Sequence, residues 1–221
     1  MHKHHAQNER TKRRYFAYLE EARRMSKSSA DQVAAAIALF ETSTGYRDFR
    51  LFHIEQARKF KRQLADAINP ATGKSLATAT IYSRLMALKA FFKWLAREPG
   101  YKRIAYSDAD YFNPSNNDGR IAKAVRKRVA ATHEQVCHVI AFMPSETDIE
   151  KRDRALVAFA LLSGARNDAM ASMSLRHVDV AQRTVFQDAR QVHAKNRKTF
   201  TSNFFPVGAD VEAIVQTGFG I

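Results

Sequence analysis

Three basic side chains in the second half of the sequence have the chemistry to bind a phosphate. Arg166 comes shortly after an apolar run at 155–162, which ends before Gly164, and Lys195 and Lys198 follow in a segment typical of a β-hairpin. A guanidinium can hold a phosphate through two parallel hydrogen bonds, and a lysine amine can donate a proton to a leaving oxygen. The chemistry suits phosphate binding by Arg166, but the spacing alone favours a surface arginine with ordinary hairpin lysines.

The composition indicates a folded protein with a polyanionic partner. The 221 residues include 36 Lys and Arg against 22 Asp and Glu, a formal net charge of +14. A surplus of this size favours nucleic acid as the partner, and a basic soluble protein without such a partner is the alternative. Because 45% of the residues are hydrophobic and 10% are aromatic, the chain can bury a core.

The sequence favours a cytoplasmic protein without a membrane, metal or cofactor partner. Cys137 is the single cysteine, which excludes an internal disulfide and fits a reducing compartment. No apolar run approaches the roughly 20 residues of a membrane span, and the basic N-terminus lacks the apolar centre of a signal peptide. His2, His4 and His5 have no second ligand cluster with which to complete a metal site.

The first half of the sequence predicts a helical domain. We expect residues 1–14 to form a disordered basic tail and residues 15–112 to fold. Apolar residues recur at helical spacing in four segments, at 15–25, 28–44, 54–68 and 75–98.

The helix predicted at 75–98 is apolar on one face and basic on the other. Its basic residues are Arg84, Lys89, Lys93 and Arg97. Such a face can lie against a phosphate backbone or in a major groove, and a solvated face is the alternative.

A polar stretch, "NPSNNDGR" at 113–120, ends the helical half. A cationic run with no acid in it follows and includes Lys123, Arg126, Lys127 and Arg128. We expect 113–131 to be a basic linker, either in contact with a polyanion or solvated, and 132–221 to be a second domain.

The second half combines helices with short strands. Thr132 and Gln135 have the spacing of a capping box, and Gly164 suits the left-handed end of a buried helix that is apolar nearly all round. Asp210 is expected to cap the last helix. Alternating β-branched and aromatic residues predict strands at 183–187, 190–194 and 198–208.

The order of these parts resembles the tyrosine recombinases, or phage-type integrases. The chain begins with a basic helical half that contains "SLATATIYSRLMALKAFFKWL", and a polar junction follows it. After the junction come a buried helix ending in "SGAR", the segment "SMSLRHVDV", and a hairpin with "AKNRKTF" and "FFPVG". The resemblance covers nearly all of residues 15–215. It implies a mainly α fold, in which a SAM-like helical core-binding domain precedes the first part of an α+β catalytic domain with a small antiparallel sheet.

The resemblance also implies roles for individual residues. Arg166 stands where the family has its first catalytic arginine, which binds the scissile phosphate and stabilises charge in the transition state. The hairpin lysine of the family is the general acid on the departing oxygen; Lys195 fits this position best, and Lys198 is the alternative. The basic helix at 75–98 would enter the DNA groove, and other recombinase protomers are further implied partners.

The chain departs from the family pattern at several positions. The family usually has an acid three residues after the first arginine, where this chain has Ala169, and Asp168 lies one residue earlier. No histidine is followed three residues later by an arginine, and the seven tyrosines, from Tyr15 to Tyr111, all precede 113–131. Because a phosphoryl-transfer site acts as a unit, we expect a truncated, catalytically incomplete recombinase that binds duplex DNA without cleaving it.

Two alternatives have no catalytic role. The first is a regulatory DNA-binding protein whose "TATIYSRLMALKAF" segment is the recognition helix of a helix-turn-helix pair. Such a protein would need neither Arg166 nor Lys195. The second is an interaction module that inhibits a full-length recombinase in trans by joining its synaptic complex.

Overall fold

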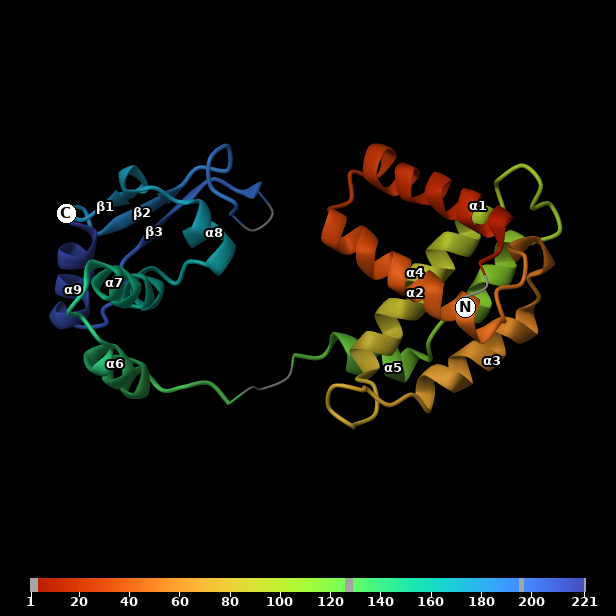
Figure 1. The fold of residues 1–221 in the computed structure, drawn as a ribbon, viewed down its shortest axis with the longest axis horizontal. Coiled ribbons are helices and arrows are strands. Elements are labelled where there is room, and N and C mark those ends of the chain that lie inside the picture. The colour runs from red at the N-terminus through yellow and green to blue at the C-terminus, as the bar shows by residue number, and fades with distance from the viewer. Residues whose placement is uncertain (1–3, 126–128, 195–196, 221) are drawn as a thin grey trace. The chain divides into compact units, whose positions relative to one another are not determined.

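The computed structural model describes residues 4–125, 129–194 and 197–220. Within them the chain is mainly helical with one three-stranded antiparallel sheet, which confirms the predicted fold class (Figure 1). The chain divides into two compact units, unit 1 (1–126) and unit 2 (127–221). Four basic residues singled out from the sequence lie outside the described residues: Arg126, Lys127, Arg128 and Lys195.

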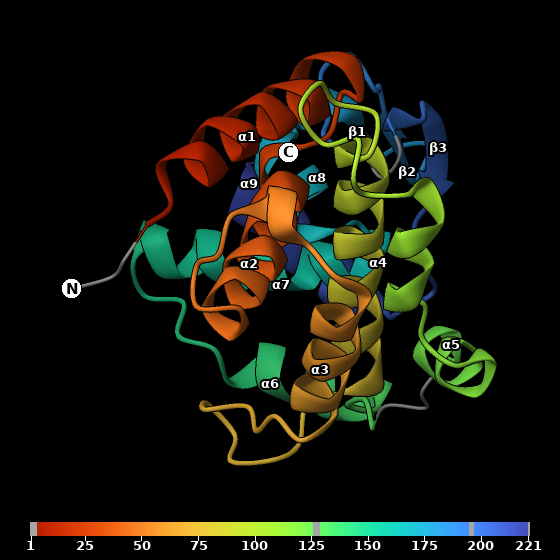
Figure 2. The ribbon, with the colours of Figure 1, turned by 90° about the vertical axis from the view of Figure 1, so that its right-hand side faces the viewer.

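Unit 1 is a helical bundle built around α4. Its elements are α1 (Ala6–Ala17), the π-helical turn η1 (Tyr18–Ala22), α2 (Lys27–Ser43), η2 (Phe49–Leu51), α3 (Ile54–Ala65), α4 (Thr78–Leu95), η3 (Tyr106–Phe112) and α5 (Asn116–Lys123). Helix α4 contacts α2, α3, α5 and η3, and Figures 1 and 2 show it among them. Phe40, Phe91, Phe92 and Phe112 fill the interior, and burial of each ring stabilises the fold by about 2 kcal/mol.

The prediction of a disordered tail over 1–14 is wrong for the part that the structure describes. Two polar residues of α1 are buried because they have partners deep in the bundle. Asn8 donates a hydrogen bond to Glu41 Oε1 at 3.1 Å, and the Thr11 hydroxyl pairs with the Tyr101 hydroxyl at 2.7 Å. The polar composition that suggested disorder instead supplies these contacts.

The predicted linker at 113–131 is also wrong in part, because helix α5 lies within it. The Ser115 hydroxyl accepts a hydrogen bond from the Asp118 N–H at 3.0 Å and thereby caps the helix. Helix α5 then packs against α4. Ser, Asn and Asp favour helix N-termini as well as loops, so the composition of this stretch did not distinguish the two.

Unit 2 packs two long helices against a small sheet. Its elements are α6 (His133–Phe142), α7 (Asp148–Ser163), α8 (Asn167–Ser172), η4 (Leu175–His177), β1 (Val178–Asp179), β2 (Thr184–Gln187), β3 (Phe200–Asn203) and α9 (Ala209–Phe219). The strand order is β1-β2-β3 with both pairs antiparallel. Helix α7 packs along α9, and Leu162 and Val215 meet Val185 of β2 in the core.

Local signals in the second half are confirmed at two helix ends. Thr132 and Gln135 form the predicted capping box at the start of α6. Gly164 ends α7 in the left-handed conformation, with φ +60°. Both positions were predictable because each depends on a few adjacent residues.

Three other expectations for unit 2 are wrong. Residues 190–194 form a turn instead of a strand, because the Arg190 guanidinium and N–H bind the buried Asp188 carboxylate and curl the chain. The last helix begins after Gly208, so Asp210 lies inside it. Helix α7 is not buried all round, since Leu156 is 41% exposed and other residues face the core.

Candidate nucleic-acid interface

Arg166 lies in a tight turn between α7 and α8. The Ser163 hydroxyl donates to the Phe159 carbonyl at 2.6 Å and accepts from the Ala165 N–H at 3.2 Å. Arg166 itself is exposed, has extended backbone dihedrals and immediately precedes the first residue of α8. The turn therefore fixes the backbone of Arg166 while its side chain stays accessible.

Gly164 allows this turn to approach the end of β3. A Cβ atom at this position would lie 2.6 Å from the Phe205 ring, closer than real Cβ contacts. The Phe205 N–H donates to the Leu162 carbonyl at 2.7 Å, which ties the segment after β3 to the end of α7. Glycine is needed here for both its positive φ and its lack of a side chain.

A cavity of about 250 Å³ opens between this turn and the sheet, and we name it the Arg166 cleft. It is lined by Ser163, Gly164, Ala165, Arg166, Ala169, Gln187, Phe200, Ser202 and Phe205. Strand register explains the contribution of the sheet, because Gln187 pairs with Phe200 and Val185 pairs with Ser202. Residues paired directly, or two apart on one strand, share a face, so Gln187 and Ser202 are both turned inward.

The Arg166 cleft contains a buried polar atom that has no protein partner among the described residues. This atom is the Ser202 hydroxyl oxygen, and the neighbouring Gln187 side chain is only 4% exposed. Arg166 has no acidic partner among these residues. A buried polar group without a partner costs about 1–3 kcal/mol, which a bound oxyanion could recover. The cleft thus has donors and one cation suited to an anion.

Sequence reasoning did not identify Gln187 or Ser202. The period of two in "TVFQ" and "FTSN" would have placed them on the same face as Val185, where polar residues are unexpected. A polar residue on the inward face of a predicted strand was therefore the available signal.

Of the other residues discussed for this site, Lys198 and Asp168 do not line the Arg166 cleft. Lys198 is exposed shortly before β3, and Lys195 lies outside the described residues. Ala169 is 2% exposed and lines the cleft where the family usually has an acid. Asp168 instead lies 3.5 Å from His193 and is mostly exposed.

The basic face predicted on α4 is divided between two roles. Lys89 lies 2.9 Å from Asp110 and donates to the Asn113 side-chain oxygen at 2.6 Å, and Lys93 lies 3.4 Å from the same aspartate. The hydrogen bond from Lys89 holds the pKa of Asp110 below its usual value. Lys89 and Lys93 thus attach η3 to α4.

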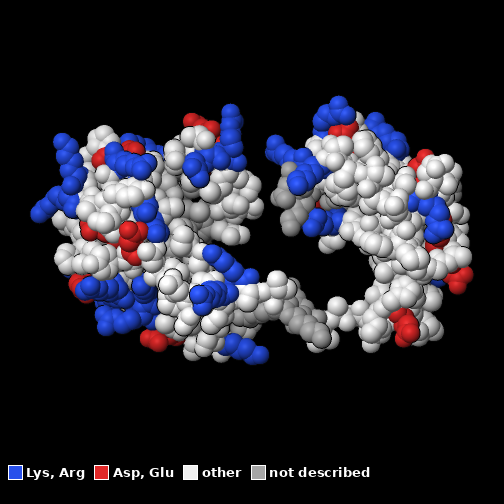
Figure 3. All heavy atoms as spheres, turned by 180° about the vertical axis from the view of Figure 1, so that it is seen from behind, with Lys and Arg blue, Asp and Glu red and all other residues white. Residues whose placement is uncertain are grey.

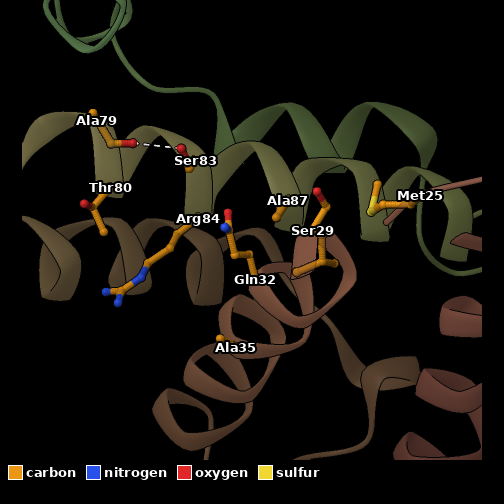
Figure 4. A pocket seen from close by; sticks show the side chains of 10 residues that line it. Met25, Ser29, Gln32, Ala35, Ala79, Thr80, Ser83, Arg84 and Ala87 are labelled. Carbon is orange, nitrogen blue, oxygen red and sulfur yellow. Dashed lines mark hydrogen bonds between the residues drawn. The ribbon is translucent and has the colours of Figure 1, made fainter. Parts of the chain in front are cut away.

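Arg84 points in a different direction from Lys89 and Lys93. It lines a groove of about 500 Å³ between α2 and α4, beside Gln32 and Ser29 of α2 (Figure 4). No described residue forms an ion pair or hydrogen bond with its guanidinium. Arg84 is therefore the member of the predicted basic face that is most available to a ligand.

Other cations lie on both units. Lys123 of α5 sits over the Tyr82 ring at 5.5 Å and is exposed, and Arg97 and Lys93 lie over Tyr106 at 4.9 Å and 4.6 Å. Lysine and arginine side chains lie at several places on the face of each unit seen in Figure 3. Both units thus present cations to a polyanion.

Metal-binding and membrane-spanning features were also sought in the described parts of the chain. They contain no group of three or more His, Cys, Asp or Glu side chains that could hold a metal ion. Within 4–125, 129–194 and 197–220, every helix is too short or too polar to cross a bilayer.

Comparison with known proteins gives one structural likeness. No protein-family model matches the chain, and no curated protein sequence is similar to it. Among solved structures, the integrase from mycobacterium phage Brujita aligns with a TM-score of 0.33 and 18% sequence identity. The alignment covers 94% of this chain and 61% of the integrase chain, so this chain spans less than two thirds of that protein.

Proposed function

We propose that the protein binds duplex DNA and belongs to the integrase type of site-specific recombinase. The observation that carries the proposal is the Arg166 cleft, where the Ser202 hydroxyl is buried without a partner among the described residues, next to the nearly buried Gln187 and an accessible guanidinium. An arginine and neutral donors in a partly enclosed site suit a phosphate of the DNA backbone. The net charge of +14 supports the same partner.

Unit 1 contributes a second DNA contact in this proposal. The groove that holds Arg84 also presents the side chains of Gln32, Ser29 and Ser83. Arginine and glutamine read base edges in the major groove, while serine hydroxyls bind bases or phosphates. Lys89 and Lys93 attach η3 to α4, and Arg84 makes the direct contact.

The decisive experiment measures duplex affinity of the full chain against salt concentration. We expect Arg166→Ala to weaken binding about tenfold and to reduce the salt slope by about one unit. Arg152→Ala is the matched control, because Arg152 is an exposed arginine of unit 2 whose guanidinium already pairs with Asp153 at 2.7 Å. Equal losses in the two variants would show that net charge alone binds DNA and would reject the Arg166 cleft.

The 221 residues by themselves are not expected to cleave DNA. No tyrosine follows Tyr111, so unit 2 supplies no phenolic nucleophile. A suicide duplex that traps a phosphotyrosyl intermediate should yield no covalent adduct with this polypeptide. An adduct mapped to any tyrosine of unit 1 would contradict the proposed division of roles.

A regulatory DNA-binding protein remains the second candidate, favoured by the accessible Arg84 in unit 1. In that case the double variant Arg166→Ala, Lys195→Ala would keep its affinity and salt slope, while Arg84→Ala would lose affinity. The recombinase proposal requires both variants to lose affinity.

A further inference from the structure

A second cavity in unit 1, of about 360 Å³, lies between η1 and the C-terminal half of α4. It adjoins the Arg84 groove, with which it shares Met25, Val33 and Ala87. We name it the aromatic cleft, and its aromatic and basic lining residues are Tyr15, Tyr18, Trp94, Tyr106, Arg23, Lys93 and Arg97.

Aromatic rings form the walls of this cleft and are partly open to solvent. The rings of Tyr18 and Trp94 are stacked, with centroids 6.2 Å apart at 29°, and Tyr15 lies 4.9 Å from Trp94. Tyr18 is 37% exposed and Tyr106 is 46% exposed. Exposed aromatic faces beside a cavity provide a surface on which another planar ring can stack.

Cations lie at the edge of the aromatic cleft. Arg97 and Lys93 sit over the Tyr106 ring, which fixes their position, and Arg23 extends from the end of η1. Lys93 also forms an ion pair with Asp110, whereas Arg23 and Arg97 have no acidic partner among the residues that the structure describes. A planar ring bound in the cleft would therefore have two guanidinium groups near its substituents, an arrangement suited to a phosphate.

Tyr15 adds a hydrogen-bonding group to the cleft. It is 2% exposed, and no described residue hydrogen-bonds to its hydroxyl, in contrast to the buried Tyr101 hydroxyl, which pairs with Thr11. Burial raises the pKa of Tyr15 to about 12, so the hydroxyl stays protonated at neutral pH and can donate. A nucleobase edge offers the matching acceptors.

We propose that the aromatic cleft binds an unstacked base of single-stranded DNA, with the adjoining phosphates on Arg23 and Arg97. Aromatic stacking surfaces combined with cations are the usual means of binding single strands without sequence preference. The site goes beyond the proposed duplex binding and does not depend on the Arg166 cleft. Its position beside the Arg84 groove would let unit 1 hold a duplex and an adjacent unpaired nucleotide.

The chain contains its own probe for this proposal, because Trp94 is the single tryptophan. A short oligothymidylate should quench Trp94 fluorescence in the full chain. An abasic strand of equal length carries the same phosphates without bases and should not. Equal quenching by both strands would mean that the cleft binds only phosphate and would overturn the proposal.

Substitutions at Tyr18 separate stacking from charge. Tyr18→Ala should weaken oligothymidylate binding about tenfold, whereas Tyr18→Phe keeps the ring and should bind nearly as wild type. Because Tyr18 is partly exposed, both variants should fold, and circular dichroism verifies this. Unchanged affinity in folded Tyr18→Ala would reject the site.

Two further measurements identify the ligand of the aromatic cleft and distinguish single-strand binding from duplex binding. Quenching by free thymidine monophosphate at the affinity of the oligonucleotide would indicate a mononucleotide site and contradict a single-strand site. Quenching by duplex as strong as by single strand would assign the cleft to the duplex interface, also against the proposal. Arg84→Ala should lose duplex affinity and keep the quenching by oligothymidylate, so either function can fail without the other.

Discussion

Two sets of buried polar groups differ in their hydrogen bonding: the contacts of Glu41 beneath α1 in unit 1 and the Arg166 cleft in unit 2. Beneath α1 in unit 1, Asn8 donates a hydrogen bond to Glu41 and accepts one from the Phe49 N–H at 3.0 Å. The Lys12 amine lies 2.6 Å from the Glu41 carboxylate. In the Arg166 cleft of unit 2, the Ser202 hydroxyl oxygen is buried with no partner from the described residues, and Gln187 beside it is 4% exposed. The first set stabilises its fold, and the second leaves hydrogen-bonding capacity for a ligand.

The largest expected effect comes from breaking the paired set. Glu41 is 1% exposed, so Glu41→Ala leaves Lys12 and Asn8 without their shared partner. We expect the free energy of unfolding of unit 1 to fall by about 3 kcal/mol. Chemical denaturation followed by Trp94 fluorescence reports unit 1 directly, since Trp94 is in α4.

Asp110→Ala is the control for this loss. It removes an acid that also pairs with lysine but is 48% exposed, so its effect should stay below about 1 kcal/mol. If the two variants lose similar amounts of unfolding free energy, then the buried Glu41 contact is no more stabilising than the exposed Asp110 contact. The comparison between the units would then fail.

The second effect concerns the backbone that forms the Arg166 cleft. Gly164→Ala combines a left-handed φ of +60° with a Cβ placed 2.6 Å from the Phe205 ring. We expect unit 2 to lose about 2 kcal/mol, from backbone strain and displacement of the ring. Gly220→Ala has a similar φ of +67° with no atom within 4 Å, so it measures strain alone and should cost about half as much. Equal losses would mean that the turn does not need its close contact with Phe205.

The third prediction tests the polar groups of the Arg166 cleft. Gln187→Leu replaces a nearly buried amide with an apolar group of similar size, so the stability of unit 2 should hold or rise slightly. Duplex affinity should fall about fivefold because the oxyanion loses a donor. Gln191→Leu is the opposite case, since its side-chain oxygen accepts from Arg176 at 3.0 Å and lies 3.1 Å from His177 Nε2. It should lower the melting temperature without weakening DNA binding. A Gln187 variant that melts earlier would show that the amide is structural.

The helices of both units could be predicted from the sequence because their signals are local. Apolar spacing located α2, α3 and α4, and the Thr132 box and Gly164 marked the ends of α6 and α7. The errors arose where tertiary contacts override composition. Asn8 and Thr11 look like residues of a disordered tail until their partners on α2 and after α4 are known.

The candidate site could be predicted only in part. Arg166 followed from the resemblance and from its position after Gly164, but the charges on α4 were treated as one face. The structure separates Arg84 from Lys89 and Lys93, because Asp110 of η3 lies against the latter two. No local pattern reveals that Asp110, which is distant in sequence, forms ion pairs with Lys89 and Lys93. The spacing of the basic residues alone therefore could not show that Arg84 is the one left without an acidic partner among the described residues.

The smallest expected effect is a change in acid stability at the turn after β2. Hydrogen bonds from Arg190 lower the pKa of Asp188 to about 2, from an ordinary value of 3.8. A carboxyl whose pKa is lower in the folded state stabilises the fold above the ordinary value, and this stabilisation is lost as the pH falls toward about 2. Asp188→Asn should therefore flatten the decline in unit 2 melting temperature across that acid range. Arg190→Ala should flatten it similarly, because it removes the cause of the shift, and a wild-type slope in both variants would show that this pair does not hold the turn.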